Sequence, residues 1–285
     1  MEGIINVNKP KGITSFDVIR KLRKILSTKK IGHTGTLDPM ATGVLLVCVG
    51  KATKLAQDIE ASSKEYVAEF ELGYKTDTYD IEGTVIDRKE NFSVTEQELL
   101  ETVNSFKGKI KQVPPMYSAI KINGQKLYDL ARKGETVERE ARDVTIEEIQ
   151  LISFDGKKAK IRCAVSKGTY IRSLIYDIGE KLGTFAVMTS LVRTRVGEET
   201  LEKSFALEEI EQLKNQENES FLTPAENYFL YPKITVEGEK NKTLFLNGNT
   251  LIYNKEDGLY RIYDENCFLG FAQIKNNRLK GYKYY

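Results

Sequence analysis

The sequence predicts a chain of mixed helices and strands that ends in a small all-β domain. Two observations predict the first part: an apolar stripe at helical spacing along residues 15–26, and alternation of apolar and polar residues along residues 66–72. A third predicts the ending, because short apolar runs separated by turn residues follow residue 231. We expect one domain at residues 1–225 and a small one at residues 231–285.

A helix, a loop and a buried strand are expected near the N-terminus. The apolar stripe of the helix consists of Phe16, Ile19, Leu22 and Leu26. Glycine recurs through residues 32–43, which contain the pair Asp38-Pro39, and this composition is typical of a loop. Residues 44–49 (VLLVCV) are apolar throughout, which predicts a strand buried on both faces.

Capping and turn residues delimit the later elements. Ser93 and Glu96 form a capping box before a helix whose apolar stripe is Leu99, Val103 and Phe106. A hairpin is expected at 144–154 and 159–165, followed by a helix at 171–182 that ends at Gly183. Residues 214–219 are expected to form a polar linker. In the small domain the strand-like pieces are ITVEG, TLFLNG, LYRIY and FLGFAQI.

Residues 114–142 interrupt this pattern. The segment begins with Pro114-Pro115, contains two glycines and is rich in charge. Long excursions from a compact core are usually functional or mobile. Because the apolar content is low, we expect this segment to be poorly ordered in the free protein.

Charge is unevenly distributed, although the formal net charge is only +2. Residues 9–30 and 107–133 are strongly basic, whereas residues 198–219 are acidic. Such segregation suits a polyanionic partner on one face. Solvated helix faces are the alternative explanation.

Missing motifs exclude several classes of function. The sequence has no GxGxxG, GxxxxGK[ST] or GxSxG motif, one histidine, and three widely spaced cysteines. Dinucleotide, phosphate-loop and multi-histidine metal chemistry are therefore unsupported. The longest apolar run is too short to span a bilayer and no secretory signal is visible, so we expect a cytoplasmic protein without a membrane partner.

The most unusual segment is residues 32–39 (GHTGTLDP). Two glycines in four residues indicate special backbone torsions or a close approach to a ligand. Pro39 holds Asp38 extended ahead of a buried strand, where a carboxylate can lie at the floor of a cleft. The alternative is that Asp38 begins a turn and His33 packs in the interior.

Residues 166–172 (SKGTYIR) join a strand to a helix and place Arg172 in the first helical turn. A cation is unfavourable there because the helix dipole is positive at this end. This position indicates a partner of opposite charge, such as a carboxylate. A plain surface arginine is the alternative.

Several long motifs resemble one family. GHTGTLDPMATGVLLVCVGKATKL is similar to the aspartate-bearing motif of the TruB family of tRNA pseudouridine synthases. NKPKGITSFDVI resembles its N-terminal motif, and four further segments resemble it in the same order: KEYVAEFELG, TDTYDIEG, VPPMYSAIKINGQKLYDLARKG and SKGTYIRSL. The resemblance runs from about residue 4 to 197, and the C-terminal part resembles a short version of the family's PUA-type RNA-binding domain.

The resemblance implies an α+β catalytic domain of pseudouridine-synthase type, built on a large mixed, mainly antiparallel sheet with flanking helices. It implies conversion of uridine 55 in the TΨC loop of tRNA to pseudouridine. The C1′–N1 bond breaks, the base turns, and C1′ joins C5. No electrons leave and no group is added, so no cofactor and no metal is required. We expect a monomer whose partner is tRNA, bound through its TΨC stem-loop.

By resemblance Asp38 is the catalytic carboxylate, which either attacks the sugar or takes a proton from C2′. Arg172 is its candidate partner, because a nearby guanidinium stabilises the ionised form. Tyr66 matches the tyrosine that stacks on the target uracil, and Tyr170 and Leu191 match residues that line the base pocket. For all three, ordinary packing in the core is the alternative.

The target base is buried in a folded loop, so it must be flipped out. His33 matches the residue that fills the space left behind. Residues 114–142, called the thumb segment below, match the loop that clamps the stem-loop by shape and phosphate contacts. The expected RNA-binding residues are Lys9, Lys11, Lys51, Lys54, Lys126, Arg132 and Arg193.

The chain departs from the family at Leu191-Val192-Arg193, where Leu-Arg-Arg is common. One phosphate contact of the family is therefore open here, with Arg195 as the candidate substitute. Two functions remain open. One is a stand-alone isomerase, favoured by the intact set of Asp38, Tyr66 and Arg172. The other is an RNA-binding or RNA-folding factor in which catalysis is secondary.

Overall fold

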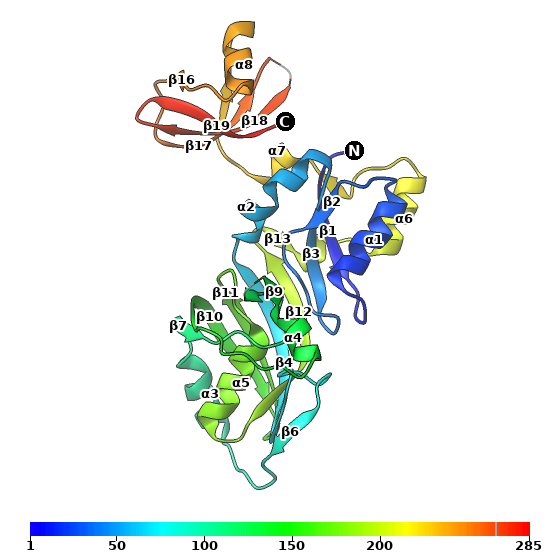
Figure 1. Cartoon of the computed structure of the whole chain (residues 1–285), viewed down its shortest axis with the longest axis vertical. Coiled ribbons are helices and arrows are strands. Elements are labelled where there is room, and N and C mark those ends of the chain that lie inside the picture. Colours follow the sequence, from blue (N-terminus) through cyan, green and yellow to red (C-terminus); the bar gives the residue numbers. More distant parts are fainter. Residues whose placement is uncertain (123, 266) are drawn as a thin grey trace.

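The computed structural model describes residues 1–122, 124–265 and 267–285, with the backbone alone at Lys126. The molecule is elongated, with the C-terminal domain at one end and both chain termini near the junction of the two domains (Figure 1). Within the described ranges, no helix is both long and apolar enough to cross a membrane.

The first domain is built on one large sheet. Its strands are β1 (Gly3–Lys9), β2 (Ile31–His33), β3 (Thr42–Val49), β4 (Lys64–Leu72), β7 (Gly108–Gln112), β10 (Arg142–Phe154), β11 (Lys158–Val165), β12 (Ala186–Val196), β13 (Glu199–Thr200) and β14 (Leu222–Thr223). They lie in the order β14-β1-β3-β12-β4-β11-β10-β7, with β2 beside β3 and β13 beside β12. The sheet is mixed and mainly antiparallel, as expected, because β3 and β12 run parallel whereas the other described pairs are antiparallel.

The parallel contact between β3 and β12 fixes the end of the loop that carries Asp38. Gly43, in β3, pairs with Arg193 of β12 and has φ +101°. A Cβ at Gly43 would collide with the carbonyl oxygen of Arg193, so glycine is required for the two strands to come this close. Asp38 therefore lies a few residues before the point at which β3 begins to pair with β12.

Helices and a small hairpin complete the first domain. They are α1 (Ser15–Ile25), η1 (Gly50–Leu55), α2 (Ala56–Glu60), β5 (Tyr74–Thr76), β6 (Val85–Arg88), α3 (Glu96–Asn104), α5 (Ile171–Leu182), η2 (Leu201–Lys203), α6 (Leu207–Asn215) and α7 (Ala225–Tyr228). Helix α5 packs on β12 and α3, whereas α1 packs on α6 and β2 (Figure 1). The main apolar core lies between these helices and the sheet.

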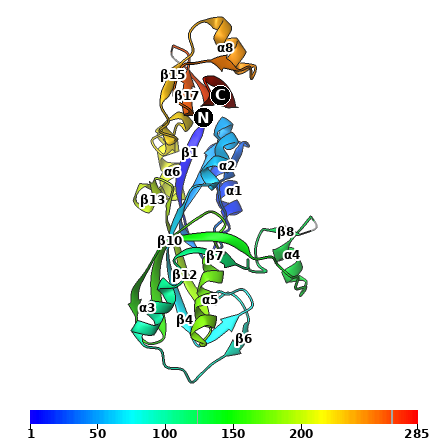
Figure 2. The ribbon, with the colours of Figure 1, turned by 90° about the vertical axis from the view of Figure 1, so that its left-hand side faces the viewer.

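The thumb segment is a folded lobe. It contains β8 (Lys121–Ile122), β9 (Gln125–Lys126) and α4 (Leu127–Arg132), and it projects sideways from the body of the domain (Figure 2). Met116, Leu127 and Leu130 form a small apolar core within it. The expectation of a poorly ordered segment assumed that its apolar content is too low for packing. This assumption is wrong, because these apolar residues pack a helix.

The C-terminal domain contains β15 (Lys233–Thr235), α8 (Glu239–Leu246), β16 (Leu251–Ile252), β17 (Gly258–Tyr263), β18 (Phe268–Lys275) and β19 (Arg278–Tyr284). Its sheet has the order β15-β17-β18-β19-β16. The domain is not all-β, because most of the expected strand TLFLNG belongs to helix α8. Short apolar runs do not distinguish a strand from a helix.

Several other elements agree with the sequence-based expectations. Strand β3 is buried on both faces along residues 43–49, and β4 buries alternate residues. The hairpin forms as β10 and β11, and α5 ends at Gly183, whose φ of +67° is the left-handed cap conformation.

Other expectations are wrong in detail. Phe16 is 56% exposed, because the buried face of α1 consists of Ser15, Val18, Ile19 and Leu22. The capping box of α3 is formed by Thr95 and Glu98, two residues after the expected pair. Residues 32 and 33 belong to β2 rather than to a loop. The expected linker at 214–219 stays in the first domain, because the chain then pairs with β1 as β14.

Candidate active site

The loop at residues 34–41 is tied to β1 and α1 on both sides of Asp38. Ser15 Oγ accepts a hydrogen bond from the Leu37 amide at 2.8 Å and donates to the Leu37 carbonyl at 3.0 Å. The carbonyl of Pro39 accepts from the Gly12 amide at 2.8 Å. Asp38 itself keeps 34% of its side-chain surface exposed. The loop therefore presents a carboxylate on a fixed backbone to an open face.

Arg172 lies opposite Asp38, as the first-turn position of this arginine predicts. Its Nε lies 2.9 Å from Asp38 Oδ2, and its side chain is only 6% exposed. The rest of the guanidinium is held by protein acceptors: Nη1 donates to the Thr78 carbonyl at 3.1 Å, and Nη2 to the Tyr117 carbonyl at 2.9 Å. The cation is enclosed, whereas the carboxylate remains accessible.

Asp80 is a member of this site that the sequence reasoning missed. Its Oδ2 lies 3.4 Å from Arg172 Nη1, and its side chain is 5% exposed. Burial raises the pKa of Asp80, while the Thr78 hydroxyl, which donates to Oδ1 at 2.7 Å, and Arg172 act against this rise. The signal was present in the motif TDTYDIEG, which contains two aspartates.

The residues expected to line a base pocket are Tyr66, Tyr170 and Leu191, and two of them are buried in the main apolar core. Tyr66 in β4 and Leu191 in β12 are 8% and 6% exposed and belong to one apolar cluster with Leu37, the residue before Asp38. Tyr170 directly precedes α5, and its amide donates to Gln112 Oε1 at 2.8 Å. Burial raises the pKa of the Tyr170 hydroxyl, so this group stays neutral at physiological pH.

His33 is half-buried in β2. Burial, assisted by the charge of Arg193, lowers the pKa of His33 below its ordinary value, so the ring is neutral at physiological pH. Its Nδ1 is buried, and within the described part of the chain no hydrogen-bond partner reaches it.

Two of the expected RNA-binding residues are instead buried and bonded to backbone carbonyls on and beside the loop that carries Asp38. Lys9 has no exposed surface, and its Nζ donates to the carbonyls of Pro10, Ile13 and Pro39 at 2.9, 2.7 and 3.3 Å. Arg193 is 2% exposed and donates through Nε to the Val44 carbonyl at 2.7 Å. The expectation that they contact phosphates is wrong, because both are enclosed and bonded to the backbone.

The other expected RNA-binding residues lie at the surface. Lys11, Lys51, Lys54 and Arg132 are exposed. Lys54 Nζ donates to the Tyr284 carbonyl of the C-terminal domain at 2.6 Å, and the Arg132 guanidinium lies 5.5 Å from the Tyr128 ring. The side chain of Lys126 lies outside the described residues. Arg195, the expected substitute contact, donates to the Gly197 carbonyl at 2.9 Å.

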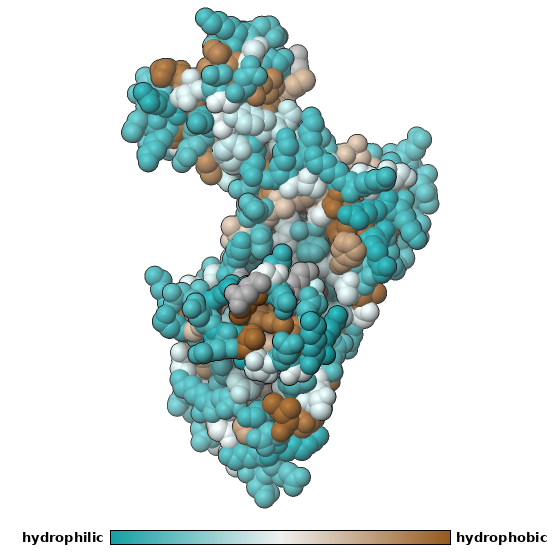
Figure 3. All heavy atoms as spheres, in the orientation of Figure 1, coloured by the Kyte–Doolittle hydropathy of each residue, from teal (hydrophilic) through white to brown (hydrophobic). Residues whose placement is uncertain are grey.

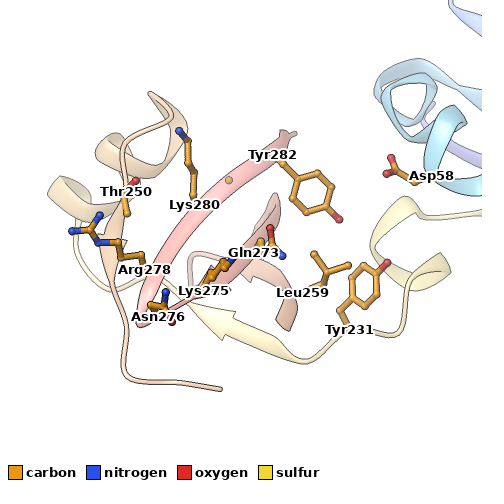
Figure 4. A pocket seen from close by; sticks show the side chains of 11 residues that line it. Asp58, Tyr231, Thr250, Leu259, Gln273, Lys275, Asn276, Arg278, Lys280 and Tyr282 are labelled. Atoms are coloured by element: carbon orange, nitrogen blue, oxygen red, sulfur yellow. The ribbon is translucent and has the colours of Figure 1, made fainter. Parts of the chain in front are cut away.

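A hollow of about 920 Å³ lies between the C-terminal sheet and α2. The basic side chains Lys275, Arg278 and Lys280 line one part of it, and Tyr231 and Tyr282 lie on the side toward Asp58 (Figure 4). The two domains also share an apolar cluster in which Phe271 of β18 packs with Ile4 and Leu46. A cation-rich concave surface is thus firmly attached to the first domain.

Comparison with protein families gives two matches. Residues 23–171 match the family described as "TruB family pseudouridylate synthase (N terminal domain)", and residues 172–229 match "tRNA pseudouridylate synthase B C-terminal domain". The second match covers helix α5 and the strands β12 and β14 of the large sheet, and ends before the small C-terminal domain.

Known relatives are similar over their whole length. A protein of Fusobacterium nucleatum named tRNA pseudouridine synthase B is 60% identical over 289 residues and covers 100% of both chains. One of the same name from Clostridium tetani is 47% identical, covering 96% of each chain. The solved "Structure of H/ACA RNP bound to a substrate RNA containing 2'-deoxyuridine" matches with a TM-score of 0.71 at 25% identity, covering 99% of this chain and 84% of that one.

Proposed function

Since the chain belongs to the TruB family of pseudouridylate synthases, we propose that it converts uridine 55 in the TΨC loop of tRNA to pseudouridine. The observation that carries this proposal is the ion pair between an accessible Asp38 and an enclosed Arg172. The names of the full-length relatives support tRNA as the substrate.

The reaction needs an ionised carboxylate next to the sugar of the target nucleotide. Asp38 faces the guanidinium of Arg172, whose Nε lies 2.9 Å from its Oδ2. The carboxylate then attacks C1′ or takes the proton from C2′, and both routes lead to release and rotation of the uracil. When C1′ joins C5 of the same base, C5 loses its proton and N1 takes one up, so the product is an isomer and atoms balance without a cofactor.

The uracil must be held while it is detached. Tyr66 supplies a ring for its face, and Leu191 and Tyr170 border the same space in the proposal. Flipping a base costs a few kcal/mol of stacking, and a neutral His33 ring can fill the gap left in the loop.

Binding of the tRNA is assigned to exposed cations on three parts of the molecule. Lys11 follows β1 and Lys51 lies in η1, Arg132 lies on the thumb segment, and Lys54 lies at the domain junction. The hollow with Lys275, Arg278 and Lys280 offers the C-terminal domain a phosphate-binding surface. The face in Figure 3 is mostly hydrophilic, with smaller apolar patches.

The test uses a bare TΨC stem-loop RNA and a control in which uridine 55 is replaced by cytidine. We expect pseudouridine at position 55 in the first RNA with wild-type protein. Tyr66→Leu should bind the stem-loop with unchanged affinity and lose most turnover, since the ring is placed at the base and not at the phosphates. Binding of the stem-loop without any conversion would favour an RNA-folding factor and contradict the proposal.

A further inference from the structure

The loop that supplies acceptors to Arg172 contains a residue in an unfavourable backbone conformation. Tyr79 has φ +66°, in the left-handed region, and lies between Thr78 and Asp80. Glycine and asparagine adopt this region readily, whereas a tyrosine does so at a cost. A bulky side chain persists in such a place when the surrounding structure holds it there.

The ring of Tyr79 is held by a stacking contact. It lies on the ring of Tyr176, with centroids 4.1 Å apart and planes at 25°. Tyr176 belongs to α5 and follows Arg172 by four residues, so both project from the same face of that helix. The stack therefore joins the 77–82 loop to the helix that carries the cation.

The ring of Tyr176 is also held in place by other neighbours. Lys75 Nζ lies 5.9 Å from the Tyr176 centroid and 3.9 Å from the Phe185 centroid. The same ammonium donates to Glu180 Oε1 at 3.2 Å, one turn further along α5. Tyr79 therefore stacks on a ring that has further contacts on its other sides.

The residues beside Tyr79 decide where the guanidinium points. The Thr78 carbonyl and Asp80 Oδ2 both engage Nη1 of Arg172, at 3.1 and 3.4 Å. With Nη1 held, Nε is directed at Asp38. Rotation of the backbone at residue 79 would displace these two acceptors relative to each other, because they lie on either side of it.

We propose that Tyr79 is a positioning residue: its stack on Tyr176 holds residues 78–80 in the conformation that aims Arg172 at Asp38. It contacts no reacting atom in this proposal. The inference rests on the proposed function only for the activity measurement, since the orientation of the Arg172 guanidinium is a property of the free protein.

The experiment separates the ring from the backbone strain. Tyr79→Gly and Tyr79→Asn accept the left-handed conformation but lack the ring, whereas Tyr79→Phe keeps the stack. We expect the first two to lower the rate at saturating tRNA at least tenfold with tRNA affinity within twofold. Tyr79→Phe should stay within twofold of wild type in both.

Two further variants serve as partner and control. Tyr176→Leu should reproduce the loss, and combining it with Tyr79→Gly should add little, because both remove one contact. Tyr74→Leu is the control: this tyrosine lies on the same hairpin but contacts Arg88 instead, 5.3 Å away, and its rate should not change. Thermal unfolding verifies that each variant is folded.

Crystal structures of the free variants give a readout that needs no activity. In Tyr79→Gly, or in Tyr176→Leu if the former does not fold, Nε of Arg172 should move out of ion-pair distance of Asp38. An unchanged Arg172–Asp38 pair with wild-type rates would overturn the inference, as would an equal loss in Tyr79→Phe. A wild-type protein without pseudouridine activity would instead refute the proposed function, and the crystal structures alone would then decide the role of Tyr79.

Discussion

Arg172 and Asp38 form an ion pair whose two members differ sharply in exposure: the guanidinium is 6% exposed and the carboxylate 34%. The cation is bonded to backbone carbonyls of two other segments, so its position is set by the protein. The carboxylate belongs to a loop fixed at Leu37 and Pro39 but faces outward. This asymmetry suits a group that must meet a substrate while its charge is stabilised from behind.

Asp80→Asn should slow the reaction without weakening tRNA binding. The amide oxygen can still accept from Thr78, but the second negative charge facing Arg172 is lost. We expect the single-turnover rate to fall about tenfold, the effect of roughly 1.4 kcal/mol on the barrier. Asp77→Asn is the control, since Asp77 accepts from the Thr84 amide in the same loop. Equal rates in both variants would refute a role for Asp80.

Arg132→Ala should weaken tRNA binding and flatten its dependence on salt. A lost phosphate contact lowers the slope of log K against log[salt] by roughly 0.7 to 0.9. The rate at saturating tRNA should change little, because the thumb segment is assigned to binding. Filter binding at several salt concentrations measures this, with Arg162→Ala, on β11, as the control. An unchanged slope would show that Arg132 is only a solvated surface residue.

Lys9→Met should destabilise the fold and leave the salt slope unchanged. Three backbone carbonyls lose a donor, which costs roughly 2 kcal/mol or more. Burial lowers the pKa of Lys9 to about 8, so between pH 8 and 10.5 the unfolded state binds more protons. Stability contributed by this group therefore rises with pH in that window. Urea unfolding of wild type should show this rise, and the variant should lack it.

Asp177→Asn should stabilise the protein at neutral pH. Burial, and secondarily the charge of Glu180, raises the pKa of Asp177 to about 6. Between about pH 4 and 6 the folded state binds more protons, so the free energy of unfolding falls as pH rises. The asparagine variant avoids this fall and should gain roughly 1 kcal/mol at pH 7. Identical pH profiles of thermal unfolding in the two proteins would contradict the assignment.

The sequence predicts well wherever one local pattern decides the outcome. The run at 44–49 became a doubly buried strand, and Gly183 capped α5, because each depends on a few neighbouring residues. Helix α8 was missed since a short apolar run fits either element. The pairing of Arg172 with Asp38 was suggested by the unfavourable charge in the first turn.

Long-range burial was beyond the reach of the sequence. Lys9 and Arg193 carry charges that normally lie at a surface, and only the fold reveals the carbonyls that enclose them. Asp80 belongs to the site only because the fold places residues 77–82 next to β12 and α5, which the sequence does not reveal. The role of Tyr79 could not be predicted either, because neither composition nor periodicity indicates a left-handed backbone at a tyrosine.

The central claim is that Asp38 performs the chemistry at uridine 55, and one measurement tests it most directly. Unmodified tRNA is incubated with wild-type protein or with Asp38→Asn, and pseudouridine is mapped at every position. The account predicts complete conversion at position 55 alone with wild type, and none with the variant, while both bind the tRNA within a few-fold of each other. Turnover by Asp38→Asn, or conversion elsewhere with position 55 untouched, would contradict it.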